Sequence, residues 1–395
     1  MIAASTAAVL LVAAQISAAS ASKPDSGYVK GKPGQEHAIG KLTFLGEQRI
    51  PNDEIFKGTL VGGLSGIDYN PVTDQWIMIS DDRSDKSPAR FYTAKLEIDT
   101  NRISNVMLTD MIELKQPDGT TFPNKSEYTA AHKGIVPDLE SIRFDPNNGS
   151  IRYTSEGDRN LGLNPFIFQA AMTGDYMTSF DIPEAFQIDP IGDNGIQKGF
   201  RNNLALEGSS FSPDGKFYFT SMEGSLYQDG AISTVGNGSY SRITKYNRNG
   251  EIVAEYAYPV DAIPAMPGPG KNADNGVTEL LALNGHRLLV LERAGVQAAD
   301  GSYSNYIRIY EADTRQATNV KNLDSLQAGP FKPVSKKLVL NLNALGLPRL
   351  DNIEGMTWGP ELDNGHGSLV LLSDNNFNSS QVTQLLAFDV APEAD

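Results

Sequence analysis

The chain has 395 residues, of which 40% are hydrophobic and 21% are charged, and it carries a formal net charge of −15 with no cysteine. This composition is typical of a globular protein and excludes a disordered chain, a disulfide scaffold, zinc–cysteine sites and thiolate catalysis. The negative charge repels nucleic-acid phosphates and anionic lipids, so we expect no nucleic-acid partner. An anionic ligand would need a local cationic pocket or bound metal ions.

The first segment, residues 1–22, has the features of a signal peptide. An apolar run at 7–14 is followed by small residues, and 19–21 read Ala-Ser-Ala, a small-x-small cleavage site. No Lys or Arg precedes the run, which departs from the usual pattern, and the alternative is a disordered Ala/Ser tail. Residues 23–40 are polar and rich in Gly and Pro and are expected to form a flexible linker.

No apolar run in the sequence reaches the roughly 20 residues that span a bilayer core. Together with the signal-like segment, this predicts an exported protein, either secreted or periplasmic, without a membrane span.

A strand, a turn and a second strand recur five times along the rest of the chain. The repeats share the form Glu, small, apolar, any residue, large apolar, and most turns contain Asn-Gly, Asp-Gly or Asn-Pro, which are hairpin signals. Each repeat therefore opens with a β-hairpin. The repeats start at Ser65, Glu140, Glu207, Glu279 and Glu354, which lie 75, 67, 72 and 75 residues apart.

Two more strand-like runs follow each of the first four hairpins, but only one, at 384–390, follows the fifth. The missing strand is available at 41–46, ahead of the first repeat. The sequence thus predicts an all-β protein: a single β-propeller domain at 41–391, with five four-stranded blades and a ring closed by the N-terminal strand. Six blades is the alternative, if an insertion hides one. A pair of β-sandwiches or a solenoid does not explain long repeats with strands in fours.

Carboxylates gather at one end of the predicted hairpins. In a propeller the first strand of each blade lines the central channel, and the second strand runs antiparallel to the first. The start of the first strand and the end of the second strand therefore lie at the same opening of the channel. Four first strands begin with a carboxylate, and the second strands end in carboxylates with three arginines among them. These residues are Glu140, Glu207, Glu279 and Glu354, then Asp81, Asp82, Glu156, Glu292 and Asp374, with Arg83, Arg159 and Arg293.

Crowded carboxylates raise one another's pKa, so a fold that keeps such a cluster must neutralise it with arginine, protons or metal. Oxygen ligands without cysteine favour Ca²⁺, with Mg²⁺ as the second choice. Guanidinium groups suit phosphate or carboxylate anions. We therefore assign metal binding to Glu140, Glu207, Glu279, Glu354, Asp82 and Asp374, catalysis to Asp81, Glu156 and Glu292, and substrate binding to Arg83, Arg159, Arg293 and His132.

Each assignment has a structural alternative. A glutamate that begins an inner strand can accept backbone N–H groups from the neighbouring blade, and arginines on a rim can form simple salt bridges. His132 lies in the first long insertion, at 116–137, where an exposed loop histidine is the competing interpretation.

The motifs Gly63-Leu64-Ser65-Gly66, Asp138-Leu139-Glu140-Ser141, Ser155-Glu156, Leu206-Glu207-Gly208, Leu291-Glu292-Arg293 and Asn352-Ile353-Glu354-Gly355 occur in this order. In order and spacing they resemble the phytase-like propeller family, described as having esterase-like activity of phytase, over about 62–390. The resemblance implies an exported bacterial propeller with phosphoesterase or esterase activity, but it supplies no catalytic set. A more typical Ser-Glu-Arg reads Ser155-Glu156-Gly157-Asp158-Arg159 here, which displaces Arg159 relative to the family pattern.

The leading hypothesis is an exported, metal-dependent phosphoester hydrolase, expected to be monomeric, that acts on a small anionic ester. A metal-bound water would be the nucleophile and a rim carboxylate the base. The alternatives are a non-catalytic binding propeller with structural calcium and a lactonase-like hydrolase with one central metal.

Overall fold

The computed structural model describes residues 37, 39–189 and 197–393, which lie within one compact unit, Lys32–Asp395. The predicted signal peptide and most of the predicted linker lie outside the described residues. The protein is all-β, with 47% strand and 6% helix. Over the described ranges, no helix has the length and apolar character needed to cross a membrane.

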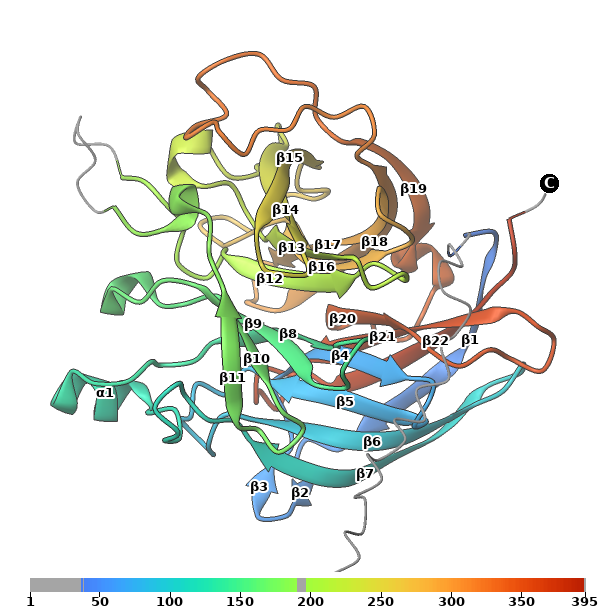
Figure 1. The fold of residues 1–395 in the computed structure, drawn as a ribbon. Coiled ribbons are helices and arrows are strands. Elements are labelled where there is room, and N and C mark those ends of the chain that lie inside the picture. The colour runs from blue at the N-terminus through green and yellow to red at the C-terminus, as the bar shows by residue number, and fades with distance from the viewer. Residues whose placement is uncertain (1–36, 38, 190–196, 394–395) are drawn as a thin grey trace, which may run out of the picture. The chain divides into compact units, whose positions relative to one another are not determined.

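Five four-stranded antiparallel sheets form the blades of a β-propeller (Figure 1). Blade 1 contains β4 (Leu64–Asn70), β5 (Gln75–Ser80), β6 (Arg90–Ile98) and β7 (Ile103–Glu113). Blade 2 contains β8 (Leu139–Phe144), β9 (Ile151–Ser155), β10 (Phe166–Ala170) and β11 (Tyr176–Phe180). Blade 3 contains β12 (Leu206–Phe211), β13 (Phe217–Met222), β14 (Ser239–Asn247) and β15 (Ile252–Val260). Blade 4 contains β16 (Gly276–Ala282), β17 (Arg287–Gln297), β18 (Tyr303–Asp313) and β19 (Ser335–Asn341).

Blade 5 combines the two ends of the domain. It consists of β20 (Asn352–Trp358), β21 (Gly367–Asp374), β22 (Thr383–Val390) and β1 (Leu42–Ile50). Strand β1 runs antiparallel to β22, with Leu42 opposite Val390 and Ile50 opposite Thr383. Each inner strand packs against the inner strand of the next blade, and β20 packs against β4. The predicted five blades and the closure by the N-terminal strand are confirmed.

The connections carry the remaining elements. They are a short hairpin of β2 (Ile55–Phe56) and β3 (Thr59–Leu60), the helix α1 (Lys125–Ala131), and four 3₁₀ turns, η1 (Arg159–Leu161), η2 (Glu184–Phe186), η3 (Tyr227–Asp229) and η4 (Leu342–Leu345). The long insertion at 116–137 holds α1 and a second one, at 183–204, holds η2; neither hides a sixth blade among the described residues.

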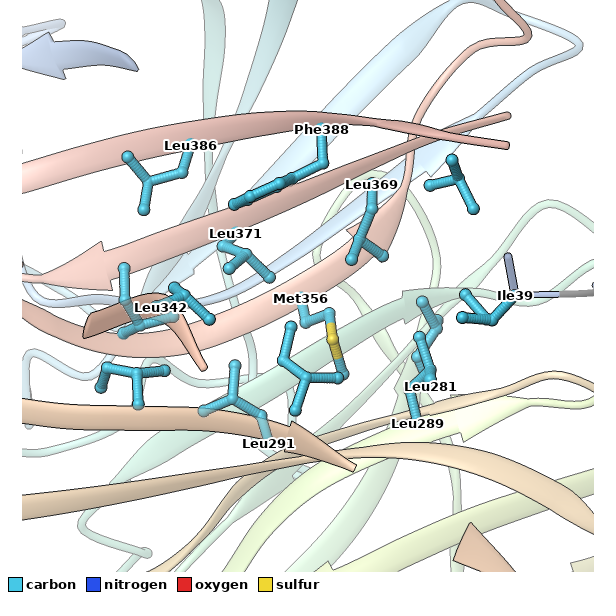
Figure 2. Packing of buried hydrophobic residues seen from close by; sticks show 14 of the residues in the cluster. Ile39, Leu281, Leu289, Leu291, Leu342, Met356, Leu369, Leu371, Leu386 and Phe388 are labelled. Atoms are coloured by element: carbon cyan, nitrogen blue, oxygen red, sulfur yellow. The ribbon is translucent and has the colours of Figure 1, made fainter. Parts of the chain in front are cut away.

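Apolar side chains fill the spaces between blades, because alternate residues of a strand project from opposite faces of its sheet. Between blades 4 and 5, Leu289 and Leu291 of β17 join a buried cluster with Leu369 and Leu371 of β21. Figure 2 shows this cluster, with Met356 of β20 lying between the two sheets. Burying each such side chain stabilises the fold by about 1.5–3 kcal/mol.

One buried arginine spans the central channel. Arg143 of β8 is only 2% exposed, and its guanidinium forms an ion pair with Glu279 at 2.6 Å. It also donates to one carbonyl of every other inner strand, so a single side chain links all five blades at the axis. The acceptors are the carbonyls of Ser209 (2.6 Å), Ile67 (2.9 Å), Met356 (3.1 Å) and Leu280 (3.4 Å).

Candidate active site: a buried carboxyl cluster

All five inner strands carry a β-bulge at the same place, near their first residue. In β4 the regular pairs are Leu64 with Ser80 and Gly66 with Ile79, so Ser65 is the extra residue. Bulges re-aim a side chain and recur beside functional sites. The residues that occupy this position in blades 1 to 5 are Ser65, Glu140, Glu207, Thr278 and Glu354.

The second strands supply an equivalent set of five. In blade 5 the pair before the bulge is Ile353 with Ser373, so the next residue along β21 is Asp374, which pairs with Asn352. The same register in blade 4 selects Arg293, which pairs with Gly276. The set in blades 1 to 5 is Asp81, Glu156, Glu223, Arg293 and Asp374.

The carboxylates of these two sets come together with Asp138 in a carboxyl cluster of eight groups, linked by mutual electrostatic interactions. Carboxylate oxygens of Asp138, Glu140 and Glu156 lie within 4.8 Å of one another, and so do those of Glu156, Glu207 and Glu223. Glu156 belongs to both groups and is thus the centre of the cluster. The eight members are Asp81, Asp138, Glu140, Glu156, Glu207, Glu223, Glu354 and Asp374.

Two guanidinium groups reach the carboxyl cluster. Arg83 lies 3.5 Å from Asp138 and is shared with Asp158 at 2.5 Å. Arg293 contacts Glu223 at 3.2 Å and Glu354 at 3.4 Å. Two positive charges cannot balance eight ionised carboxylates, so the cluster must hold protons or bind further cations.

The pKa values of the cluster reflect this imbalance. Burial raises the pKa of Glu223 to about 8, although the Arg293 guanidinium opposes the change. Burial, opposed by Arg83, raises the pKa of Asp138 to about 7. For Glu156, burial and then repulsion from Asp138 and Glu223 raise the pKa well above its usual range. A bound cation would remove this cost by favouring the ionised forms.

Asp374 contributes a buried oxygen that has no hydrogen-bond partner. Asp374 is 1% exposed; its Oδ1 accepts a hydrogen bond from the backbone N–H of Asn376 at 2.8 Å, but its Oδ2 accepts none. A buried carboxylate oxygen without a partner is costly. A donor set made only of carboxylate oxygens fits Ca²⁺ or Mg²⁺.

Asp81 of blade 1 and Glu140 of blade 2 are the partly exposed members of the cluster. Asp81 is partly exposed, whereas Glu156 is 2% and Glu223 is 3% exposed. The Asp81 carboxylate packs against Gly63, where a Cβ atom would lie 1.9 Å from Asp81 Oδ1 and where φ is +58°. Only glycine fits this position, which fixes the approach of Asp81 to the cluster.

The structure corrects the predicted place of Glu279. It lies one residue beyond the bulge position, which Thr278 occupies in blade 4. Its carboxylate instead accepts from the backbone N–H groups of Ser209 and Leu280 and pairs with Arg143. Glu279 is therefore part of the Arg143 linkage and not of the carboxyl cluster.

Glu292 and Asp82 also lie away from the cluster. Glu292 and Arg293 are neighbours on β17, so their side chains project to opposite faces, and Glu292 binds Lys336 and the Tyr258 hydroxyl (2.8 Å). Asp82 pairs with the buried Arg90 at 2.8 Å and accepts from three backbone N–H groups of residues 85–87. Both carboxylates are fully engaged in structural contacts.

Two predicted substrate-binding residues are likewise elsewhere. Arg159 begins η1 and donates to the carbonyl of Phe200 at 2.9 Å; no ion pair of Arg159 is found among the residues that the structure describes. His132 ends α1 in a left-handed conformation, with φ 49°, and is exposed beside Tyr128. The structure thus joins Arg83 and Arg293 to the cluster but not Arg159 or His132.

Asp138 and Glu223 are the members that the sequence assignment missed. Asp138 stands two residues before Glu140, and so on the same face of an extended segment, which is a usable signal. Glu223 ends the third second strand, just as Glu156 ends the second. An alignment on the ends of the second strands would have included it.

The family described as "Phytase-like: Esterase-like activity of phytase" matches residues 59–377. The chain belongs to this family. Membership and fold together indicate a propeller of hydrolase type. No curated protein matches the chain.

Several solved structures are distantly similar to this phytase-like chain. A tail fibre of Staphylococcus aureus phage P68 is 11% identical with a TM-score of 0.36, and the match covers 89% of this chain and 52% of the fibre. A thermostable family-43 glycoside hydrolase is 11% identical with a TM-score of 0.39, and the match covers 85% of this chain and 91% of the hydrolase. A glucose dehydrogenase is 15% identical with a TM-score of 0.34, and the match covers 91% of this chain and 98% of the dehydrogenase. The chain spans about half the length of the fibre, and we draw no functional conclusion from these similarities.

Proposed function

We propose that this member of the phytase-like family is an exported, metal-dependent hydrolase of phosphoric esters, with the carboxyl cluster as its active site. The observation that carries the proposal is the charge imbalance of the cluster, in which eight carboxyl groups, six of them buried, meet two guanidinium groups. The unpartnered Oδ2 of Asp374 adds an oxygen suited to a cation. Export rests on residues 1–22 alone.

The cation-binding residues would be those whose oxygens are closest together. Asp138, Glu140 and Glu156 form one group, and Glu156, Glu207 and Glu223 form the other. Ca²⁺ is the first choice and Mg²⁺ the second, because every donor is an oxygen. When bound, such an ion polarises a phosphoryl group and lowers the pKa of water.

The remaining groups suit the handling of substrate and protons. Arg83 is 29% exposed at its side chain, so an anionic ester could contact it from solvent while Asp138 and Asp158 hold it in place. Burial and the charges of Asp374 and Asp138 raise the pKa of Asp81 well above its usual range. A partly exposed carboxyl group with a raised pKa is suited to accept a proton from attacking water.

A second candidate function belongs to another class, a binding propeller in which calcium is purely structural. The deep burial of Glu156 and Glu223 favours it, as does the hydrogen bond from the backbone N–H of Ala205 to Glu156 at 2.5 Å. Such carboxylates could hold an ion that only joins blades 2 and 3.

The test is an assay of the purified protein with p-nitrophenyl phosphate and, separately, with a simple lactone, each with Ca²⁺, with Mg²⁺ and with chelator. We expect phosphatase activity that chelator abolishes and calcium restores. Glu156→Gln should lower the rate at least about 100-fold. The matched control is Glu255→Gln, which alters a buried carboxyl group paired with Arg242 in blade 3. Activity on the lactone alone would indicate the lactonase-like alternative, and no turnover of either ester would leave the binding propeller.

A further inference from the structure

A pair of arginines outside the carboxyl cluster shares one tyrosine ring. The guanidinium carbon of Arg159 lies 4.8 Å from the centre of the Tyr227 ring, and that of Arg201 lies 4.1 Å from the same centre. The three residues come from three separate connections: η1, the segment before β12, and η3. These connections follow or precede the strand ends that bear Glu156, Glu207 and Glu223, so they lie at the same end of blades 2 and 3 as the cluster.

Hydrogen bonds between the connections hold the pair in place. The backbone N–H of Arg159 donates to the Asn202 side chain at 2.9 Å, and its guanidinium donates to the Phe200 carbonyl at 2.9 Å. Arg201 donates to the carbonyls of Ser225 (3.0 Å) and Gly230 (2.9 Å). Both guanidinium groups are thus positioned by backbone contacts and lose little freedom when they bind a ligand.

Among the described residues neither arginine has an acidic partner. Over the described ranges no ion pair involves Arg159 or Arg201, although the chain carries 48 Asp and Glu against 33 Lys and Arg. Asp158, next to Arg159, and Asp229, two residues after Tyr227, are already used. Asp158 pairs with Arg83 and caps η1, whereas both oxygens of Asp229 bind Arg242, at 2.7 and 2.9 Å.

The two like charges also affect each other. Burial, together with the charge of Arg159, lowers the pKa of Arg201. Contact with an aromatic face offsets only part of the cost of burying these cations. Two partly exposed guanidinium groups that lie against one tyrosine ring, with no carboxylate partner among the described residues, offer forked donors to an anion with several oxygens.

We propose that Arg159, Arg201 and Tyr227 form an anion-binding site, separate from the carboxyl cluster, that takes a phosphate or carboxylate group. Bidentate contacts from the two guanidinium groups would hold the oxygens, and Tyr227 would keep the arginines apart from the carboxylates around them. The site does not depend on the proposed hydrolase activity. The bound group could be a free anion or part of a larger ligand.

The experiment measures anion binding to the chelator-treated protein, in which no metal in the carboxyl cluster can recruit the anion. Inorganic phosphate and acetate are titrated by calorimetry, with chloride at the same ionic strength as the reference. We expect wild type to bind phosphate at one site, with acetate weaker. Arg201→Gln and Arg159→Gln should each weaken phosphate binding at least about tenfold, because a charged, forked donor is lost.

Two further variants keep the test decisive. Arg201→Lys retains the charge but not the fork, so its phosphate affinity should fall between wild type and Arg201→Gln. Arg102→Gln alters an exposed arginine near Asp99 and should bind as wild type does. Thermal melting of each unliganded variant establishes that it is folded. The proposal is overturned if wild type binds no phosphate above the chloride reference. It is also overturned if folded Arg159→Gln and Arg201→Gln bind phosphate as tightly as wild type does.

Discussion

Two levels of the central channel differ sharply in how their charges are balanced. At the level of Arg143, one guanidinium meets Glu279, with Asp68 3.5 Å away, and four backbone carbonyls, so nearly every donor has an acceptor. At the carboxyl cluster, Arg83 and Arg293 meet eight carboxyl groups. The first level has the composition of a structural linkage. The second is complete only when protons or cations are added, and this is why we place the function there.

The largest effect should come from removing the linkage. Arg143→Met leaves Glu279 and Asp68 buried without a counter-charge and removes the donors of four carbonyls. Breaking a buried pair in this way costs about 3–5 kcal/mol in the free energy of unfolding, which denaturant unfolding can measure. The loss should be the same with calcium and with chelator. A loss below about 1 kcal/mol would show that the blades do not depend on this residue.

Unlike the Arg143 linkage, the carboxyl cluster should make the stability of the protein depend on calcium. Calcium at one hundred times its dissociation constant should stabilise wild type by about 2.7 kcal/mol, as measured by thermal or denaturant unfolding. Glu156→Gln should abolish this gain, because Glu156 belongs to both oxygen groups. The same substitution should stabilise the chelated protein at neutral pH, because folding no longer requires a carboxyl group with a raised pKa to take up a proton. A variant that still gains stability from calcium as wild type does would contradict the assignment.

Stability against pH gives a smaller but more specific contrast. The pKa of Glu223 is raised from 4.5 to about 8 in the folded protein, so the folded state holds a proton that the unfolded state releases. The chelated protein should therefore lose stability as pH rises from about 5 to about 8, relative to Glu223→Gln. One pKa unit corresponds to about 1.4 kcal/mol.

The difference between wild type and Glu223→Gln isolates this group from the other titrating residues. Calcium should flatten the difference, because the cation replaces the proton. If wild type instead gains stability relative to the variant between pH 5 and 8, Glu223 is stabilised as a carboxylate and the pKa argument fails.

The sequence was sufficient for the fold because the determining signals are local. Turn residues mark each hairpin, and apolar and polar residues alternate along the strands. The fifth repeat is one strand short, and the N-terminal strand supplies the missing one. These features need no knowledge of exact register.

The site required that knowledge, and the sequence prediction was wrong where register decided the outcome. Glu279 matches the other first-strand glutamates in residue type but lies one position after the bulge, at which the side chain points to Arg143. Glu292 and Arg293 were both placed at the rim, although adjacent residues of a strand cannot face the same side. A bulge adds one residue without a sequence signature that we could recognise.

The ion pairs also could not be predicted from the sequence. Asp81 and Asp82 are identical in type and adjacent in sequence, yet one faces the cluster and the other neutralises Arg90. Which of two neighbouring carboxylates meets a distant arginine depends on the packing of a loop, here residues 82–89. Arg143, the residue that links the blades, occupied a position that the repeat leaves open to any residue.

The closure of blade 5 sets the order in which the fold can be completed. Strand β1 is made long before β22, its partner in blade 5. Until then β1 can pack against β7, but it lacks the strand that pairs with its backbone groups. Such closure over nearly the whole chain is intrinsically slow, because the entropy of joining the ends must be lost before the contacts form.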